Sequence, residues 1–198
     1  DNKINGLDRE VVGNIFPKVT GGFSSTLSWK GISLYARFDY ALGHTLYNDL
    51  AARTLGQYQG AFNIITEVKD MWSEDNPNSD LPAFYYADQL AKKNITRSNN
   101  ASASRHNNSS RLYEKADYLA LRELTLSWDL PKAWTSKAFI QNASVYVTGQ
   151  NLFYVTGYTG TSPEPVLTNS DNNENLYGVD QGRYPTPRTV LFGLSVTF

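Results

Sequence analysis

The sequence predicts an all-β fold that forms part of a transmembrane antiparallel β-barrel, and two patterns predict it. First, about five segments alternate apolar with small or polar side chains over roughly ten residues, the length that a tilted membrane-spanning strand needs. Second, the connections between these segments run short, long, short, long along the chain. Outer-membrane barrels have short turns on one side of the membrane and long loops on the other, so the two patterns agree.

The clearest of these segments is the last one, residues 188–198. Side chains of a strand alternate between its two faces, so one face of this segment is apolar and the other is small and mostly polar. The apolar face carries Val190, Phe192, Leu194, Val196 and Phe198. We expect lipid against this face and the barrel lumen against the other.

The first two strands are expected at 19–29 and 32–43, with a tight lysine–glycine turn between them. The second strand alternates along its whole length, and Arg37 and Asp39 fall on its polar face. In a barrel these two charges would line the lumen. On a soluble sheet they would face solvent, and alternation alone does not separate the two cases.

The third and fourth strands are expected at 118–130 and 143–155. Glu123 and Asp129 fall on the polar face of the third strand, so they are expected to face the lumen as well and to pair with charges on neighbouring strands. The apolar residues of this strand change parity just before Glu123. Either a β-bulge lies at this point or the strand begins at the membrane edge there.

The two long loops are expected at 44–117 and 156–187, on the outer side of the membrane. The first should be partly helical, because Asn48 is a suitable N-cap for a helical pattern that continues to Trp72. Aromatic rings stack on sugars and anchor interfaces, so we expect some loop aromatics to contact a substrate or a partner. The alternative is packing within the loops or at the membrane interface. The candidates are Tyr47, Trp72, Tyr85, Tyr86, Tyr158, Tyr177 and Tyr184.

The start of the chain resembles the second half of a calcium-binding loop. Asp1, Lys3 and Asp8 occur at the spacing that an EF-type loop gives to a ligand, a backbone carbonyl and a closing carboxylate. The first half of such a loop would precede Asp1. An ordinary Asn/Asp turn is the alternative, and calcium is the one cofactor that the sequence suggests.

Composition excludes several classes of function. The 198 residues carry 18 Lys and Arg against 19 Asp and Glu, a net charge of −1, which argues against nucleic-acid binding. There is no cysteine and hence no disulfide framework. No run of about 18 apolar residues predicts a transmembrane helix. The mean hydropathy of −0.45 is compatible with a barrel, in which only alternate residues of a strand need be apolar.

An enzyme is not expected, and a soluble binding module is the alternative to a membrane protein. Nucleophilic catalysis needs a base and an orienting group, yet His44 and His106 are the only histidines and no carboxylate-flanked serine motif accompanies them. A soluble carbohydrate-binding β-sandwich would share the alternation and the aromatic residues. It would stay in solution without detergent, whereas a barrel protein would not.

The sequence is also expected to be a piece of a larger barrel. It begins at Asp1 without a leader, although a barrel protein must be exported. An odd set of about five strands cannot close a barrel, and open strand edges in lipid would leave backbone groups without hydrogen bonds.

Five separated segments, in the same order along the chain, resemble the C-terminal part of SusC/RagA-type TonB-dependent transporters of Bacteroidota outer membranes. The strand motif at 118–131 has Ala120 where that family usually has arginine. The other segments are 13–17 with 21–23, 70–72 with 76–77 and 81–82, 149–153 with 157–164, and 184–189 before the final strand.

The resemblance implies a nutrient importer with a barrel of about 22 strands filled by a plug domain. This chain would supply the last five strands and their outer loops. The implied partners are the rest of the barrel and its plug, a SusD-like surface lipoprotein as a lid, the TonB complex and membrane lipids, with an oligosaccharide or a peptide as cargo. The lumen-facing Arg37, Asp39, Glu123 and Asp129 could also meet the plug.

Overall fold

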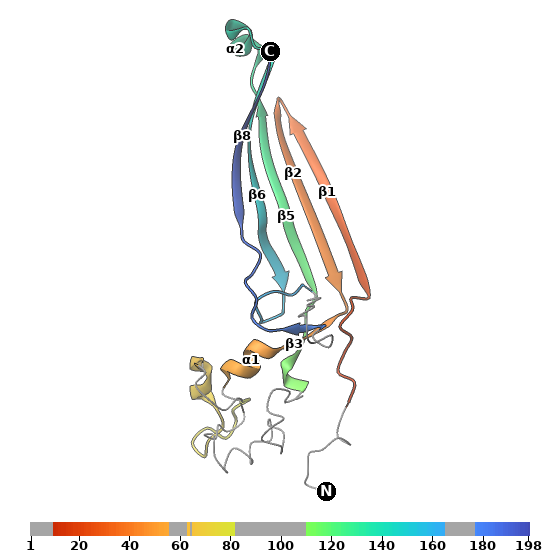
Figure 1. Cartoon of the computed structure of the whole chain (residues 1–198), viewed down its shortest axis with the longest axis vertical. Helices are drawn as coiled ribbons and strands as arrows, with labels where there is room; N and C mark the ends of the chain where they lie inside the picture. The colour runs from red at the N-terminus through yellow and green to blue at the C-terminus, as the bar shows by residue number, and fades with distance from the viewer. Residues whose placement is uncertain (1–9, 56–62, 64, 82–109, 165–176) are drawn as a thin grey trace, which may run out of the picture.

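The computed structural model describes residues 10–55, 63, 65–81, 110–164 and 177–198. Its main feature is one antiparallel sheet in the strand order β1-β2-β5-β6-β8 (Figure 1). The strands are β1 (Val19–Trp29), β2 (Ile32–Leu42), β5 (Tyr118–Asp129), β6 (Asn142–Thr156) and β8 (Thr189–Thr197). They begin and end within about one residue of the ranges expected from alternation, because that pattern follows directly from strand geometry.

Strand register follows the alternation of the sequence. Ile32 pairs with Trp128, Trp128 with Val145 and Val145 with Leu194, so one apolar row crosses four neighbouring strands. At the turn between β1 and β2, Lys30 and Gly31 have φ values of 48° and 82°. Left-handed geometry at both positions matches the right-handed twist of the strands that the turn joins.

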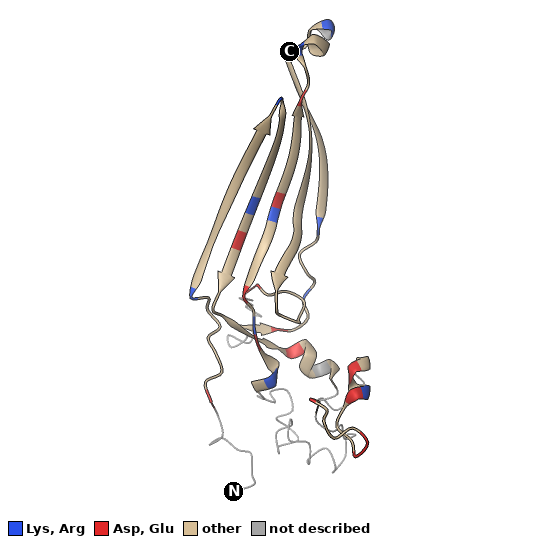
Figure 2. Cartoon of the chain, turned by 180° about the vertical axis from the view of Figure 1, so that it is seen from behind, with Lys and Arg blue, Asp and Glu red and all other residues tan. Residues whose placement is uncertain are grey.

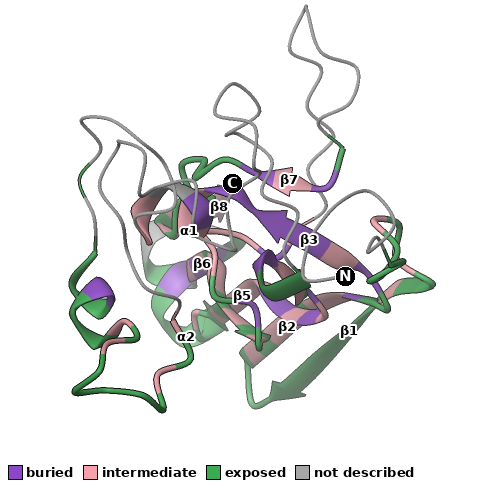
Figure 3. Cartoon of the chain, turned by 90° about the horizontal axis from the view of Figure 1, so that it is seen from below, coloured by how far each residue is buried: buried purple, intermediate pink, exposed green. Residues whose placement is uncertain are grey.

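The apolar face of this sheet is uncovered. Leu27 is 67% exposed and Phe192 is 82% exposed, although both face the same side as the apolar row described above. Apart from the short helix at Lys132–Thr135, whose Trp134 contacts Trp128 at the short-turn end, neither a helix nor another sheet of the described chain lies against this face (Figures 1 and 3). The two outer strands, β1 and β8, each have one strand partner among the described residues, so each presents one unpaired backbone edge.

The buried core lies at one end of the sheet, among the long loops. A second, three-stranded sheet in the order β4-β3-β7 forms there from β3 (Thr45–Asn48), β4 (Tyr113–Lys115) and β7 (Val179–Asp180). Figure 3 shows buried residues gathered at this end. Three buried clusters carry the packing: Ala41 with Tyr118 and Ala120, Leu46 with Ala116 and Tyr158, and Tyr47 with Ala52 and Leu112.

Between β3 and β4, the first long loop contains short helices: α1 (Asp49–Thr54), the 3-10 helix η2 (Thr66–Asp70) and the 3-10 helix η4 (Ser110–Leu112). Asn48 caps α1 as expected, since its side-chain oxygen accepts a hydrogen bond of 2.9 Å from the Ala51 amide. Within the expected helical range up to Trp72, the described residues form α1 and the 3-10 helix η2, and residues 56–62 and 64 lie outside the described residues.

The opposite end of the sheet carries the short connections. The helix α2 (Lys132–Thr135) and the 3-10 helix η5 (Ser136–Ala138) lie between β5 and β6, and the C-terminus lies beside them (Figure 1). Among the described residues, no helix has both the length and the apolar character needed to cross a membrane.

Candidate functional site

Arg122 lies at a β-bulge near the loop end of the sheet. Arg37 pairs with Glu123 and Phe38 pairs with Leu121, so Arg122 is the extra residue of β5 between two pairs. This confirms the bulge alternative for the parity change. Because of the extra residue, the leucines before and after the bulge all face the apolar side, and the Arg122 side chain joins the polar face.

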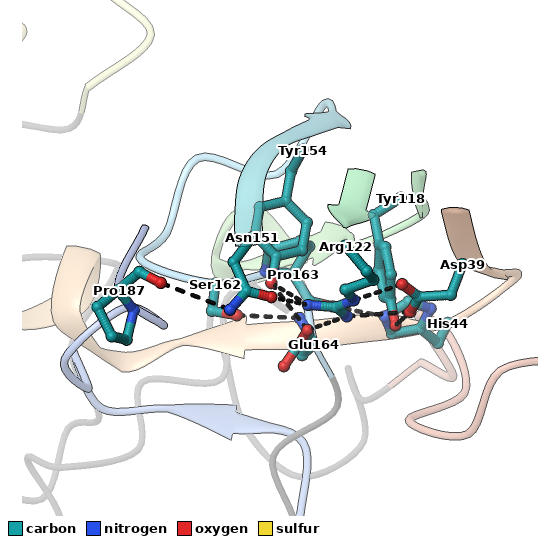
Figure 4. A network of polar contacts seen from close by, with 10 residues as sticks. All are labelled: Asp39, His44, Tyr118, Arg122, Asn151, Tyr154, Ser162, Pro163, Glu164 and Pro187. Carbon is teal, nitrogen blue, oxygen red and sulfur yellow. Dashed lines mark hydrogen bonds and ion pairs between the residues drawn. The ribbon is translucent and has the colours of Figure 1, made fainter. Parts of the chain in front are cut away.

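The guanidinium of Arg122 is the centre of a polar cluster (Figure 4). It makes ion pairs with Asp39 on β2 and with Glu164 in the second long loop. It also donates a 2.8 Å hydrogen bond to the Tyr154 hydroxyl, which in turn donates to Glu164 at 2.8 Å. Asn151 completes the cluster, and its left-handed φ of 52° fits a residue type that tolerates this conformation. Three strands and one loop therefore meet at a single arginine.

The charged residues of this cluster lie close together in the part of β2 and β5 that is nearer the loops. Figure 2 shows the charged positions of β2 and β5 as neighbours in an otherwise nearly uncharged sheet. The Arg122 side chain is 19% exposed, and Asp39 and Glu164 are 33% and 34% exposed. Arginine presents a rigid fork of donors that can serve two carboxylates at once. The arrangement can therefore hold the Glu164 segment against the sheet.

A second polar centre, Asp180, lies buried in β7. Its carboxylate accepts hydrogen bonds from the Tyr158 hydroxyl at 2.9 Å, the Thr161 amide at 3.1 Å and the Gly182 amide at 2.9 Å. A buried carboxylate is tolerated only when donors of this kind replace water. Burial, followed by the charge of Asp180 and its hydrogen bond, raises the pKa of Tyr158 far above its ordinary value.

A third centre links the two long loops directly. The carboxylate of Glu114 in β4 accepts hydrogen bonds from the Thr159 amide at 2.9 Å and from the Asn48 side-chain amide at 3.0 Å. Nearby, the parallel pairing of Tyr47 with Val179 joins β3 to β7. The first loop supplies Asn48 and Glu114, and the second supplies Thr159 and Val179. The loops are thus fixed to each other over the end of the sheet.

His44 adds a buried contact at the point where β2 passes into β3. Its Nε2 atom lies 2.8 Å from the Pro163 carbonyl, so that nitrogen carries the hydrogen. The ring also makes an edge contact with Tyr118, at a centroid distance of 6.2 Å. The residue beside Glu164 is therefore held by a histidine while Glu164 itself is held by Arg122.

The charged residues predicted to face the lumen lie on the polar face of the sheet, but they are not all brought together. Arg37 and Glu123 are cross-strand partners, and their side chains form an ion pair with 3.9 Å between Nη2 and Oε2. The Arg37 side chain is 56% exposed. Asp39 belongs to the Arg122 cluster. Asp129 lies apart at the short-turn end, where its amide donates to the Gly31 carbonyl at 2.8 Å.

The predicted loop aromatics divide into buried and exposed residues. Tyr47 and Tyr158 belong to the buried clusters at the loop end. Trp72, Tyr177 and Tyr184 are exposed, and Tyr184 is exposed almost completely. Tyr85 and Tyr86 lie outside the described residues, as do the suggested calcium-loop residues Asp1, Lys3 and Asp8. In the part of the chain that the structure describes, no group of three or more His, Asp or Glu side chains could hold a metal ion.

Sequence reasoning missed Arg122, Glu164 and Asp180 as polar centres. Arg122 was detectable in principle, since it stands at the parity change of the third expected strand. Glu164 and Asp180 lie in a loop without periodicity, and only the fold brings them to their partners.

Comparison with known proteins finds sequence relatives of this chain, although no family model matches it. Two proteins of Formosa agariphila, TonB-dependent receptor P3 and TonB-dependent receptor P26, are each 30% identical to it over 100% of its length. The chain is homologous to the TonB-dependent receptors. It spans about one fifth of the length of these relatives, 18% of P3 and 19% of P26.

Solved structures agree with the sequence relatives. The RagAB peptide importer in its open-open state matches 100% of this chain and 19% of its own, with a TM-score of 0.71 and 26% identity. The closed-closed state of the same importer matches with a TM-score of 0.71 and 27% identity. The resemblance of the sequence to SusC/RagA-type receptors is therefore confirmed.

Proposed function

We propose that this chain forms part of the wall and the outer loops of a TonB-dependent importer in a bacterial outer membrane. The observation that carries the proposal is the single sheet whose apolar face is uncovered while its polar face holds the Arg122 cluster. In lipid, an uncovered apolar face is favourable, and polar groups belong on the lumen side.

The unpaired edges of β1 and β8 support the same proposal. Backbone N–H and C=O groups without partners cost several kcal/mol each in a bilayer, so both edges require neighbouring strands. Further strands of a closed barrel of about 22 would supply them. A soluble carbohydrate-binding sandwich needs a second sheet against the apolar face, and the described residues provide none.

For the cargo and the lid, the proposal follows the resemblance. The joined loops lie at the end of the sheet that faces outward in this orientation, so a SusD-like lipoprotein would dock on them, and TonB would drive uptake from the other side. The cargo is a peptide or an oligosaccharide. The name of the structural neighbour, a peptide importer, favours the peptide.

Uptake by intact cells tests this function. Cells that produce the full-length receptor should accumulate labelled oligopeptides or oligosaccharides, and cells that lack either the receptor or TonB should not. Accumulation that is equal in all three strains would contradict the proposal, as would recovery of the full-length protein in the soluble fraction without detergent.

Docking of the lid is tested at Trp72, an exposed ring in the first long loop. Replacing Trp72 with Ala should weaken co-purification of the lipoprotein with the receptor or slow uptake, because exposed aromatic rings dominate many interfaces. Replacing Trp134, an exposed ring at the opposite end of the sheet, with Ala is the matched control for lid binding, and co-purification of the lipoprotein should be unchanged in it. Unchanged lid binding and uptake in the Trp72 variant would remove this residue from the lid interface.

A further inference from the structure

The connection between β5 and β6, at the end of the sheet away from the loops, exposes large aromatic rings. Trp134 in α2 is 59% exposed and Phe139, just after η5, is 92% exposed. Soluble surfaces seldom present two such rings in one short connection, and exposed apolar patches indicate contact with a partner or a membrane.

A ring contact shows on which side of the sheet this connection lies. Trp134 packs edge-on against Trp128, with ring centroids 5.8 Å apart and planes at 83°. Trp128 belongs to the apolar row that includes Val145 and Leu194. The connection therefore folds toward the uncovered apolar face and away from the polar face that holds the Arg122 cluster.

Lysine residues lie in the same connection as these rings and in the neighbouring turn. Lys132 and Lys137 are exposed in the same connection, and Lys30 in the neighbouring turn lies 4.6 Å above the ring of Trp29. None of the ion pairs among the described residues involves these three lysines. Neither connection, 30–31 or 130–141, contains an acidic residue, and the nearby Asp129 is the last residue of β5. The ring-bearing end is thus net positive.

The backbone of Phe139 has a left-handed conformation. Its φ is 61°, the left-handed conformation that ends the 3-10 helix η5, and the amide of the next residue, Ile140, donates a 3.1 Å hydrogen bond back to the Thr135 carbonyl. The ring gains little from the chain itself, because it is almost fully exposed. The helix cap accounts for the backbone conformation, so it is the exposed ring that bears on contact with a partner or a membrane.

We propose that the surface formed by Lys30, Lys132, Lys137, Trp134 and Phe139 binds anionic phospholipids of the membrane leaflet on the short-turn side. The lysines contact headgroup phosphates, and the two rings enter the boundary between headgroups and acyl chains. This inference rests on the membrane orientation in the proposed function. It adds a lipid-recognition site and its chemical class.

Lipid binding to the full-length receptor tests the inference. The purified receptor is titrated in detergent with phosphatidylglycerol or with phosphatidylcholine, and bound lipids are counted by native mass spectrometry. We expect tighter binding of phosphatidylglycerol, and the double variant K132Q/K137Q should bind it about thirtyfold more weakly. The difference should shrink as salt is raised.

Two variants serve as controls. The double variant K18Q/K69Q removes two exposed lysines from the loop end, so its affinity for phosphatidylglycerol should equal that of the parent. Phe139→Asn removes the ring but keeps a residue type that tolerates the left-handed conformation, so the fold should be retained. This variant should bind both lipids more weakly.

The outcomes separate this inference from the proposed function. If the receptor resides in the membrane but K132Q/K137Q binds phosphatidylglycerol like the parent, the lipid site is refuted and the importer proposal stands. Equal binding of both lipids that is lost in Phe139→Asn alone would refute headgroup recognition. If the receptor does not reside in a membrane at all, the proposed function fails first.

Discussion

At the scale of single residues, Arg122 joins more parts of the chain than its neighbours on the sheet do. The extra residue of the β5 bulge turns its side chain to the polar face, where its fork of donors reaches Asp39, Glu164 and Tyr154. A lysine at this position would keep the charge but could not serve two carboxylates in one plane. The two carboxylates would repel each other without the arginine.

Replacing Arg122 with Ala should therefore release the segment around Glu164. We expect the opening free energy of residues 157–164 to fall by about 1–2 kcal/mol, since the hydrogen bonds are charged but partly exposed to water. Hydrogen exchange of these amides in the full-length protein measures the change. Arg122→Lys should give an intermediate value.

Arg37→Gln is the matched control for this prediction. Arg37 also lies on the polar face, but its pair with Glu123 is long and exposed, and such pairs contribute little to stability. The same amides should exchange at the parental rate in this variant. Equal protection in Arg122→Ala and Arg37→Gln would show that Arg122 does not hold the loop.

At the scale of secondary-structure elements, the loop end of the sheet is where stability is concentrated. The small sheet β4-β3-β7 combines strands from both long loops, and its polar contacts converge on Glu114 and Asp180. The five long strands contribute the buried cluster of Ala41, Tyr118 and Ala120 at this same end, and over the rest of their length their apolar side chains face outward. Local contacts at one end thus fix loops that the sheet alone would leave free.

The protonation of Tyr158 makes this end sensitive to alkaline pH. The pKa of Tyr158 is raised above its ordinary value of 10.0 by burial and then by Asp180. A raised folded-state pKa contributes stability that is fully present below about pH 10 and is lost as pH rises through the folded pKa. Hydrogen exchange of the β7 amides, corrected for the intrinsic effect of pH, should therefore show reduced protection above pH 10.

Tyr158→Phe isolates the cause of that loss. The variant lacks one donor to Asp180, so its protection should be lower at neutral pH. Its remaining alkaline loss should be smaller and come from Tyr113, whose pKa is also raised by burial. An alkaline loss as steep as that of the parent would show that Tyr158 is not the titrating group.

At the scale of the whole molecule, the decisive property is the difference between the two faces of the sheet. Large apolar side chains are exposed on one face, and the polar cluster lies on the other. In water this arrangement would be unfavourable, because exposed apolar area costs free energy. In a barrel wall the same arrangement is stabilising, since lipid covers the apolar face.

A lysine introduced on the apolar face and one introduced on the polar face should differ in how strongly they destabilise the receptor. Leu124→Lys puts a lysine near the middle of the apolar face and should destabilise the assembled receptor by about 2–4 kcal/mol. Gln150→Lys is the matched control, because Gln150 pairs with Glu123 on the polar face. Denaturant unfolding of the full-length receptor in detergent or lipid measures both. Equal destabilisation would argue against lipid on the apolar face.

The sequence by itself determined the strands and their apolar and polar faces through alternation, and the N-cap at Asn48 through the residue type that precedes a helical pattern. These properties depend on neighbours two to four residues apart, and such spacings can be read along the chain. The parity change before Glu123 left two alternatives, and the register of β2 against β5 decided for the bulge.

Only the tertiary structure decided which polar residues meet. Arg122 and Glu164 are 42 residues apart in sequence, and Asn48 reaches Glu114 across 66 residues. No periodic signal connects such positions, because long irregular loops follow no repeating geometry. The sequence also grouped Asp129 with Arg37, Asp39 and Glu123 on the polar face, and the fold placed it at the far end of the sheet. Side-chain direction is set locally, whereas contact depends on how the loops fold back over the sheet.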